Sequence, residues 1–269
     1  MTPLHVENNS IEAPLYSLVG ESSITKKLTS SMVMSSDASD EEPSIGLSIK
    51  GNGRATACAI IHPGTKGKID FVSVGTSLTH ISNVKAQTKK VRFKVTKDVG
   101  LITSSQVQEE AVLKITEDCM SSYIADIDVA FLNKLYDLAP KIHSERVRIT
   151  SDNIKKECER VEITSGGEVG SALVFTNTED EGRVAELHEL LGSSLEHGVR
   201  ISMLPIQCLG LPLNESVLMI LPHPEVLGMT YYAHLPTANT TRVANTFSVE
   251  IYETSVTVIP DIMAMSILC

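Results

Sequence analysis

The chain has 269 residues, of which 42% are hydrophobic, and its mean hydropathy is close to zero. These values exclude a disordered chain and leave enough length for one large domain or two moderate ones. Asp and Glu number 33 against 23 Lys and Arg, and this net charge of −10 argues against a general nucleic-acid-binding protein. Aromatic residues make up 4% with no Trp, so a stacking platform for single-stranded nucleic acid is disfavoured.

The five cysteines are scattered and include no CxxC pair, which favours free thiols in a reducing compartment over a disulfide framework. The opening residues, MTPLHVENNS, lack the basic and apolar regions of a signal peptide. No stretch of about 18 consecutive apolar residues occurs, so we expect no membrane partner.

The first 44 residues are polar, and the stretch TSSMVMSSDASDEEPS combines Ser and acids without a helical or strand period. A segment of this composition cannot bury enough apolar surface to fold alone. We therefore expect an N-terminal arm that becomes ordered only by lying on another surface.

From Ser44 to Lys97 the pattern changes to strands, with IGLSIKG, ATACAIIH, KIDFVSVG and KKVRFKVT separated by Gly or Pro. Residues 43–97 hold ten basic residues and one acid, a net charge of +9, whereas the rest of the chain carries −19. The stretch KAQTKKVRFKVTK at 85–97 is an edge strand whose lysines block unwanted pairing, or a contact strand for a polyanion. Its cations are Lys85, Lys89, Lys90, Arg92, Lys94 and Lys97.

A very long helix is predicted next. Ser105 and Gln108 fit a capping box, and apolar residues then recur in steps of three and four until Pro140. The run predicts a helix of about 33 residues and about 50 Å. The e and g positions lack a clear charge pattern, so packing along a sheet is favoured over a coiled coil. The residues expected to make that packing include Ile115, Tyr123, Ile127, Phe131 and Leu135.

Beyond residue 150 helices and strands alternate. The sequence predicts a helix at 152–162, buried strands at 171–177 and 215–221, and between them a helix that starts at a capping box on Thr178 and has Gly192 as its C′ residue. Near the end, Phe247, Val249 and Ile251 alternate with Ser248, Glu250 and Tyr252, which is typical of a two-sided strand.

No motif predicts a catalytic residue, a metal site or a cofactor, so we expect a protein that is not an enzyme. His188 and Glu189 begin a zinc-protease pattern, but Gly192 stands where the second His ligand is required. HPGTKGK at 62–68 departs from a phosphate-binding loop at both ends, and GNGRAT at 51–56 is a turn because no helix follows it.

Three passages together resemble the major capsid proteins of tailed phages, which have the Hong Kong 97-like fold that encapsulin shell proteins share. Residues 71–137 resemble an extended loop leading into a spine helix, 171–192 resemble an axial-domain strand and helix, and 215–267 resemble the closing stretch. The resemblance lies in pattern and order over about residues 45–268, since the family has no invariant motif.

The resemblance implies an α+β fold with five parts. They are an N-terminal arm (1–44), an extended loop that is a basic β-hairpin together with its lead-in (45–103), a spine helix of the peripheral domain (104–150), an α/β axial domain (151–232), and a peripheral-domain loop with closing strands (233–269).

The resemblance also implies a coat protein that self-assembles into an icosahedral shell of pentamers and hexamers enclosing phage double-stranded DNA. The shell would be assembled in the host cytoplasm and be found in the virion. The partners would be other copies of the chain, with scaffold, portal and decoration proteins as partners that the family admits, and DNA as a non-specific cargo. The extended loop would lie on a neighbouring subunit, so the six cations at 85–97 would make a salt-sensitive contact between subunits.

Three alternatives stay open: an encapsulin-like shell around a protein cargo, a nucleic-acid-binding protein that uses residues 85–97, and an α/β enzyme. Some capsid-family members also cross-link a loop Lys to an Asn of another subunit beside a Glu. The positions implied here are Lys85, Lys89 or Lys90, with Asn239 or Asn245, and Glu250 or Glu253. The sequence selects none of these.

Overall fold

The computed structural model describes residues 8–11, 23, 25, 28–34, 43–50, 53–63, 68–96, 105–166, 169–176, 181–194, 200–205, 216–222, 227–243 and 246–269. The helices are α3 (Ser105–Tyr136), α4 (Ala139–Ile142), α5 (Ser151–Ser165), α6 (Glu181–Ser194) and the 3-10 turn η3 (Ile262–Ala264). The strands are β1 (Asn8–Ile11), β2 (Thr29–Val33), β3 (Ser44–Lys50), β4 (Thr56–Ile61), β5 (Ile69–Val74), β6 (Leu78–Lys85), β7 (Gln87–Thr96), β8 (Val169–Thr176), β9 (Arg200–Pro205), β10 (Ser216–Pro222), β11 (Gly228–Val243), β12 (Thr246–Ile259) and β13 (Ser266–Leu268).

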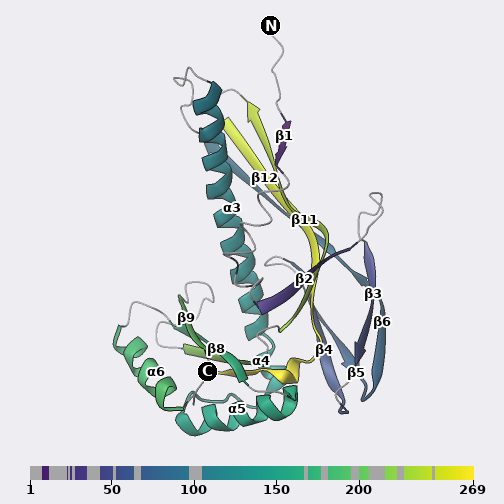
Figure 1. Ribbon diagram of the computed structural model, residues 1–269, viewed down its shortest axis with the longest axis vertical. Helices are drawn as coiled ribbons and strands as arrows, with labels where there is room; N and C mark the ends of the chain where they lie inside the picture. The colour runs from purple at the N-terminus through teal and green to yellow at the C-terminus, as the bar shows by residue number, and fades with distance from the viewer. Residues whose placement is uncertain are drawn as a thin grey trace.

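A seven-stranded sheet built around the long antiparallel pair β11 and β12 forms the body of the molecule (Figure 1). Its main path is β1-β11-β12-β4-β5, while β2 pairs with β11 and β7 pairs with β12. The predicted two-sided strand is confirmed, because Val249 and Ile251 are buried while Ser248, Glu250 and Tyr252 are partly exposed. The second half of β12 is buried at every position, since other layers cover both of its faces.

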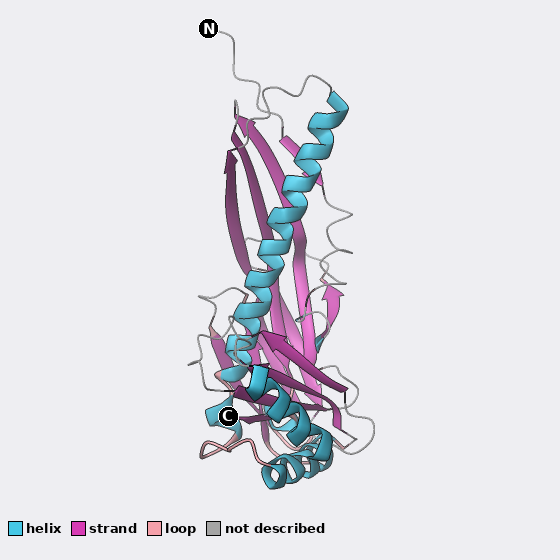
Figure 2. Ribbon diagram, turned by 90° about the vertical axis from the view of Figure 1, so that its left-hand side faces the viewer, coloured by secondary structure: helices cyan, strands magenta, loops and turns pink. Residues whose placement is uncertain are grey.

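The predicted long helix is confirmed as α3, which has 32 residues and lies along one face of this sheet (Figure 2). Its first half packs Ile115, Cys119 and Tyr123 against Val249 and Ile251 of β12. Its second half joins the largest apolar cluster, which also contains side chains of β4, β10 and the end of the chain. From Val112 onward, where its side chains are described, the helix is therefore held by tertiary burial, as a helix of this size requires.

A smaller α/β unit lies at the C-terminal end of α3. Its sheet has the order β13-β10-β8-β9, with β8 and β9 parallel, and α5 and α6 pack against it. Helix α5 starts at the cap residue Thr150 and ends at Gly166, which has a left-handed φ of 70°. The prediction that α6 ends before Gly192 is wrong, because the helix continues to Ser194 and Gly192 shows no left-handed φ.

The boundaries predicted for the last two parts do not coincide with breaks in the fold. Strand β11 continues from Gly228 to Val243, so the boundary between residues 232 and 233 falls inside it. Strand β13, which the prediction gave to the peripheral part, is an edge of the α/β sheet through its pairing with β10.

The hairpin predicted within residues 45–103 is present but does not include the most basic strand, because β3 and β4 pair with β6 and β5 in nested antiparallel register from Ser44↔Lys85 to Ile61↔Ile69. Strand β3 pairs with β6 in a separate two-stranded sheet, and β4 pairs with β5. Strand β7, the basic one, is antiparallel to β12 from Thr246↔Thr96 to Ser255↔Gln87. The β3–β6 sheet packs on the second half of β12 through Leu47, Ile49 and Val84 against Val256 and Val258.

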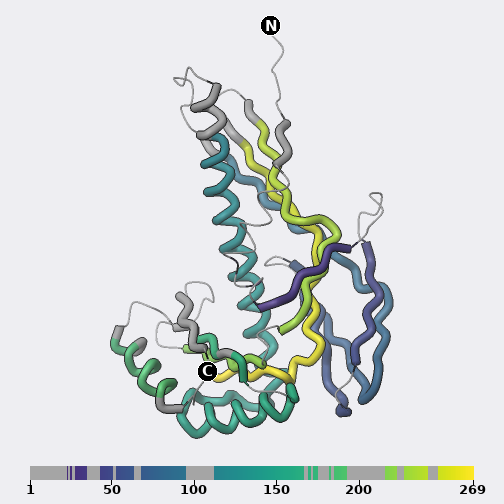
Figure 3. Tube along the Cα trace, in the orientation of Figure 1, coloured from purple at the N-terminus to yellow at the C-terminus, as the bar shows by residue number. Residues whose placement is uncertain are grey.

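The described part of the N-terminal segment lies on the rest of the chain. Strand β2 runs parallel to β11, and Figure 3 shows it crossing from α3 toward the end of β3. Before it, Oδ1 of Asp128 on α3 accepts hydrogen bonds from Ser23 Oγ (2.8 Å), Thr25 N (2.9 Å) and Thr25 Oγ1 (2.8 Å). Ser23, Thr25 and residues 28–34 thus bridge the helix and the sheet.

Candidate subunit-interaction surface

The basic strand β7 has two different faces. Val91 and Phe93 point toward α3 and pack against the cluster that contains Tyr123. Lys90, Arg92 and Lys94 alternate with them and are exposed on the opposite face of the sheet. We call these three residues the cationic face of β7.

The cationic face is partly balanced by one acid of β12. Lys90 Nζ lies 2.7 Å from Glu250 Oε1, and both side chains are open to solvent. In the strand register Arg92 lies opposite Glu250, and Lys94 lies opposite Ser248. An ion pair this exposed contributes little stability. The face therefore keeps an excess of positive charge that a second molecule can reach.

The other predicted contact residues lie in different surroundings. Lys85 is exposed at the end of β6, on the separate two-stranded sheet. Lys97 lies outside the described residues. Lys89 points toward α3, with its side chain 9% exposed, and its ammonium lies 5.0 Å from the Tyr123 ring centroid and 3.9 Å from Asp126 Oδ2. Burial lowers the pKa of Lys89, while Asp126 and Glu253 oppose that shift. Lys89 therefore joins β7 to α3 within one chain.

Within the described residues β7 pairs only with β12, so it is an edge strand of the body sheet. Exposed lysines along an open edge hinder pairing with a further strand. The edge-strand interpretation of the stretch 85–97 therefore has structural support, and it is compatible with a charged contact through the cationic face.

The predicted packing residues of α3 fall into both halves of its buried side. Ile115 and Tyr123 belong to the apolar cluster shared with β12, and Ile127 is partly buried and packs against that cluster. Phe131 and Leu135 lie in the larger cluster shared with the α/β unit.

Sequence reasoning missed two charged residues on the same side of the helix, Asp128 and Lys134. Asp128 binds the N-terminal segment as described, and Lys134 Nζ donates a hydrogen bond to the carbonyl oxygen of His62. Both residues are over nine-tenths buried. The sequence did contain a sign of these two residues. Positions 128 and 134 share a helix face with the apolar positions 131 and 135, so a charged side chain there is expected to be buried and to need a partner.

The positions that the resemblance implies for a cross-link are only partly brought together. Asn239 of β11 lies opposite Glu250 of β12, and Glu250 binds Lys90. All three belong to one chain here, whereas the cross-link would join two. Glu253 is buried and accepts a hydrogen bond from Ser255, and Asn245 lies outside the described residues.

Across the described ranges, His, Cys, Asp and Glu form no group of three that could hold a metal ion. His188 and Glu189, which begin the incomplete zinc-protease pattern, are exposed on α6. Cys58, Cys119, Cys158 and Cys269 form no disulfide, and burial raises the pKa of Cys58 to about 12. Among the helices that the structure describes, none is long and apolar enough to cross a bilayer.

A long helix laid along an elongated sheet, with an α/β unit at one end, is the architecture of the Hong Kong 97-like capsid fold, and solved structures support this assignment. A virus-like particle protein from Pyrococcus furiosus is similar with a TM-score of 0.52 and 9% identity, over 96% of this chain and 97% of that one. A protein of Mycobacterium phage Adephagia is similar with a TM-score of 0.53 and 8% identity, over 97% of this chain and 90% of that one. A protein of Microbacterium phage Oxtober96 has a TM-score of 0.50 and 11% identity, over 100% and 94% of the two chains.

No family model and no curated protein matches the sequence. At identities near one residue in ten, the structural likeness establishes the fold alone. The chain therefore has the Hong Kong 97-like fold that the resemblance implied.

Proposed function

We propose that this chain is a major capsid protein that assembles with copies of itself into a closed icosahedral shell of pentamers and hexamers around phage double-stranded DNA. The observation that carries the proposal is the extent of the shared fold. It takes in 96% of this chain and 97% of the protein from the virus-like particle. The shared fold therefore covers nearly the whole of this chain, and in the Pyrococcus furiosus protein the same fold forms a particle.

The cationic face of β7 is proposed to make an electrostatic contact between subunits, together with Lys85 and Lys97. Residues 43–97 carry +9 and the rest of the chain −19, so any neighbouring copy offers an acidic surface. Charges on exposed side chains are screened over about 8–10 Å at physiological salt, so this contact should weaken as salt rises. Lys89 is not included, because its side chain is 9% exposed.

A shell that holds protein instead of DNA is the second candidate, and the similarity to a virus-like particle protein supports it equally. An acidic subunit suits either cargo, since a lining that gripped DNA tightly would hinder packing. The contents of isolated particles distinguish the two.

The test is to isolate particles from cells that express the chain in its native genetic setting, treat them with nuclease and image them by negative-stain electron microscopy. The capsid proposal expects closed shells that protect double-stranded DNA. Closed shells that hold only protein would instead establish a compartment. A chain that stays dispersed in those cells and binds DNA directly would contradict both shell functions.

A further inference from the structure

The two places where the chain passes between its small and large sheets lie side by side. One is the β3–β4 connection at Gly53, which has a φ of 73°, and the other is the β5–β6 connection at Thr76. The amide of Gly53 donates a hydrogen bond to the carbonyl oxygen of Thr76 over 3.1 Å. This point, which we call the sheet junction, ties the β3–β6 sheet to the β4–β5 part of the body.

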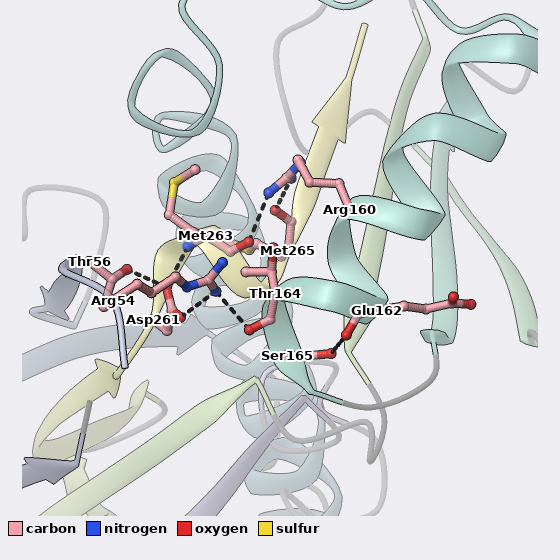
Figure 4. A network of polar contacts seen from close by, with 9 residues as sticks. All are labelled: Arg54, Thr56, Arg160, Glu162, Thr164, Ser165, Asp261, Met263 and Met265. Carbon is pink, nitrogen blue, oxygen red and sulfur yellow. Dashed lines mark hydrogen bonds and ion pairs between the residues drawn. The ribbon is translucent and has the colours of Figure 1, made fainter. Parts of the chain in front are cut away.

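Arg54 extends from the sheet junction to the α/β unit (Figure 4). Its Nη2 donates to the carbonyl oxygen of Thr164 over 2.7 Å and lies 3.2 Å from Oδ2 of Asp261. Thr164 is in the last turn of α5, where carbonyl groups lack helical partners and a cation is favoured. Asp261 follows β12 in the segment that leads into β13 of the α/β sheet.

Asp261 and α5 are themselves fixed by further bonds. Asp261 Oδ1 accepts hydrogen bonds from the Thr56 hydroxyl and from the amide of Met263, over 2.9 Å for the latter. Arg160 of α5 donates to the carbonyl oxygens of Met263 (2.9 Å) and Met265 (2.7 Å), and Figure 4 shows both arginines approaching the same segment. Arg54 therefore ends on groups that cannot easily move.

Apolar packing and hydrogen bonding make different contributions at this joint. The largest apolar cluster includes residues of the body, such as Ile61, and residues of the α/β unit, such as Leu173 and Met219. Burial of apolar surface holds the two parts together but has no preferred direction. Hydrogen bonds do have one, since they weaken steeply away from a linear arrangement.

We infer that Arg54 is a positioning residue that sets the angle between the body sheet and the α/β unit, and thereby the curvature of the shell. The inference rests on the proposed function, because a curvature exists only in an assembly. In a closed shell a small change of angle within each subunit is repeated in every copy. Loss of Arg54 should therefore change or broaden the diameter of the particles, while the fold and the ability to associate remain.

The experiment compares the wild-type chain with Arg54→Ala and Arg54→Lys, and uses Arg148→Ala as the control. Arg148 is an exposed arginine that precedes α5, and its side chain is not part of the joint. Circular dichroism and the urea midpoint show whether each variant folds. Cryo-electron microscopy gives the distribution of shell diameters, and small-angle X-ray scattering of the unassembled chain gives its shape.

We expect wild type and Arg148→Ala to give one diameter, Arg54→Ala to give several or a shifted one, and Arg54→Lys to lie between them. If Arg54→Ala does not fold, Arg54→Lys alone carries the comparison. If the wild type forms no shells, the proposed function fails, and the scattering curves decide the inference separately. Superimposable scattering curves, or shells of unchanged diameter, for folded Arg54 variants would overturn it.

Discussion

At the scale of single residues, Asp128 shows how one buried carboxylate organises distant parts of the chain. Its Oδ1 accepts hydrogen bonds from Ser23 and Thr25, more than a hundred residues away, and the residue is 8% exposed. A hydrogen bond to a charged group contributes about 1.5–3 kcal/mol. The carboxylate thus fixes the N-terminal segment beneath α3.

Replacing Asp128 by Ala should lower the free energy of unfolding by about 3 kcal/mol, because the donors of Ser23 and Thr25 lose their buried acceptor. Asp128→Asn keeps one acceptor oxygen and should lose less. The measurement is urea unfolding of the unassembled chain. Asp118→Asn, on the exposed side of the same helix, is the control and should change the midpoint little. Equal midpoints for Asp128→Ala and the control would refute this role.

Lys134 should give a pH dependence of stability. Burial lowers its pKa to about 8, Lys89 adds to that shift, and Asp137 opposes it. Between pH 8 and about 10.4, the ordinary value for Lys, the unfolded chain binds this proton and the folded chain does not. Folding is therefore favoured progressively as pH rises through this interval, and below pH 8 the effect of Lys134 is constant.

The comparison that isolates this effect is wild type against Lys134→Met, by urea unfolding at pH values from 7 to 10. Relative to the variant, the wild type should gain on the order of 2 kcal/mol between pH 8 and 10. A difference between the two proteins that does not change over this interval would contradict the pKa shift.

At the scale of elements, a helix or strand could be predicted when the pattern that specifies it lies within its own residues. The period of apolar residues in α3 is contained in the helix itself, so its existence and its buried face followed from the sequence. Strand β11 was missed because its residues show no clean alternation, and Pro236 lies where the register with β12 shifts. The strand conformation of β11 therefore depends on its pairing with β12, which the sequence of β11 alone does not reveal. The pairing of β7 with β12 was missed for the same reason, since a strand pattern does not name the partner.

Replacing either of two glycines by Ala tests how much space lies beside the backbone at these positions. A Cβ on Gly228, where β11 begins, would lie 2.3 Å from the carbonyl oxygen of Val258 on β12. Gly228→Ala should therefore force the strands apart and lower the free energy of unfolding by about 3 kcal/mol.

The matched substitution is Gly192→Ala in α6, where no atom lies within 4 Å of the added Cβ. It should raise the free energy of unfolding by up to about 1 kcal/mol, because Ala is the better helix former. Urea unfolding of both variants gives the comparison. A loss of stability in Gly192→Ala would show that the helix ends at Gly192, as the sequence had suggested.

The cationic face of β7 is an element-scale prediction about assembly. Arg92→Gln with Lys94→Gln removes two charges without placing an acid opposite Glu250. We expect this double variant to fold normally and to assemble more weakly at low salt, with a smaller salt dependence. Lys155→Gln with Lys156→Gln, on the exposed side of α5, is the control. Light scattering against salt concentration measures assembly, and identical curves for wild type and both variants would remove β7 from the interface.

At the scale of the whole molecule, apolar burial and surplus charge lie in different places. Buried apolar clusters run through the body and the α/β unit, while the surplus positive charge lies exposed on an edge strand. The excess of basic residues at 43–97 was evident from the sequence, because charge can be counted without a fold. Its division between the buried Lys89 and the exposed Lys90, Arg92 and Lys94 required the structure, since it depends on which side of β7 faces α3.

Sedimentation velocity of the purified chain, from low to high salt and over a range of protein concentrations, shows directly whether the chain assembles with copies of itself. The subunit has a mass of 29.1 kDa. A shell protein should show a discrete species many times heavier than the subunit, whose fraction rises with protein concentration and falls as salt screens the contacts between subunits. A single boundary at the mass of the subunit under every condition would contradict the account.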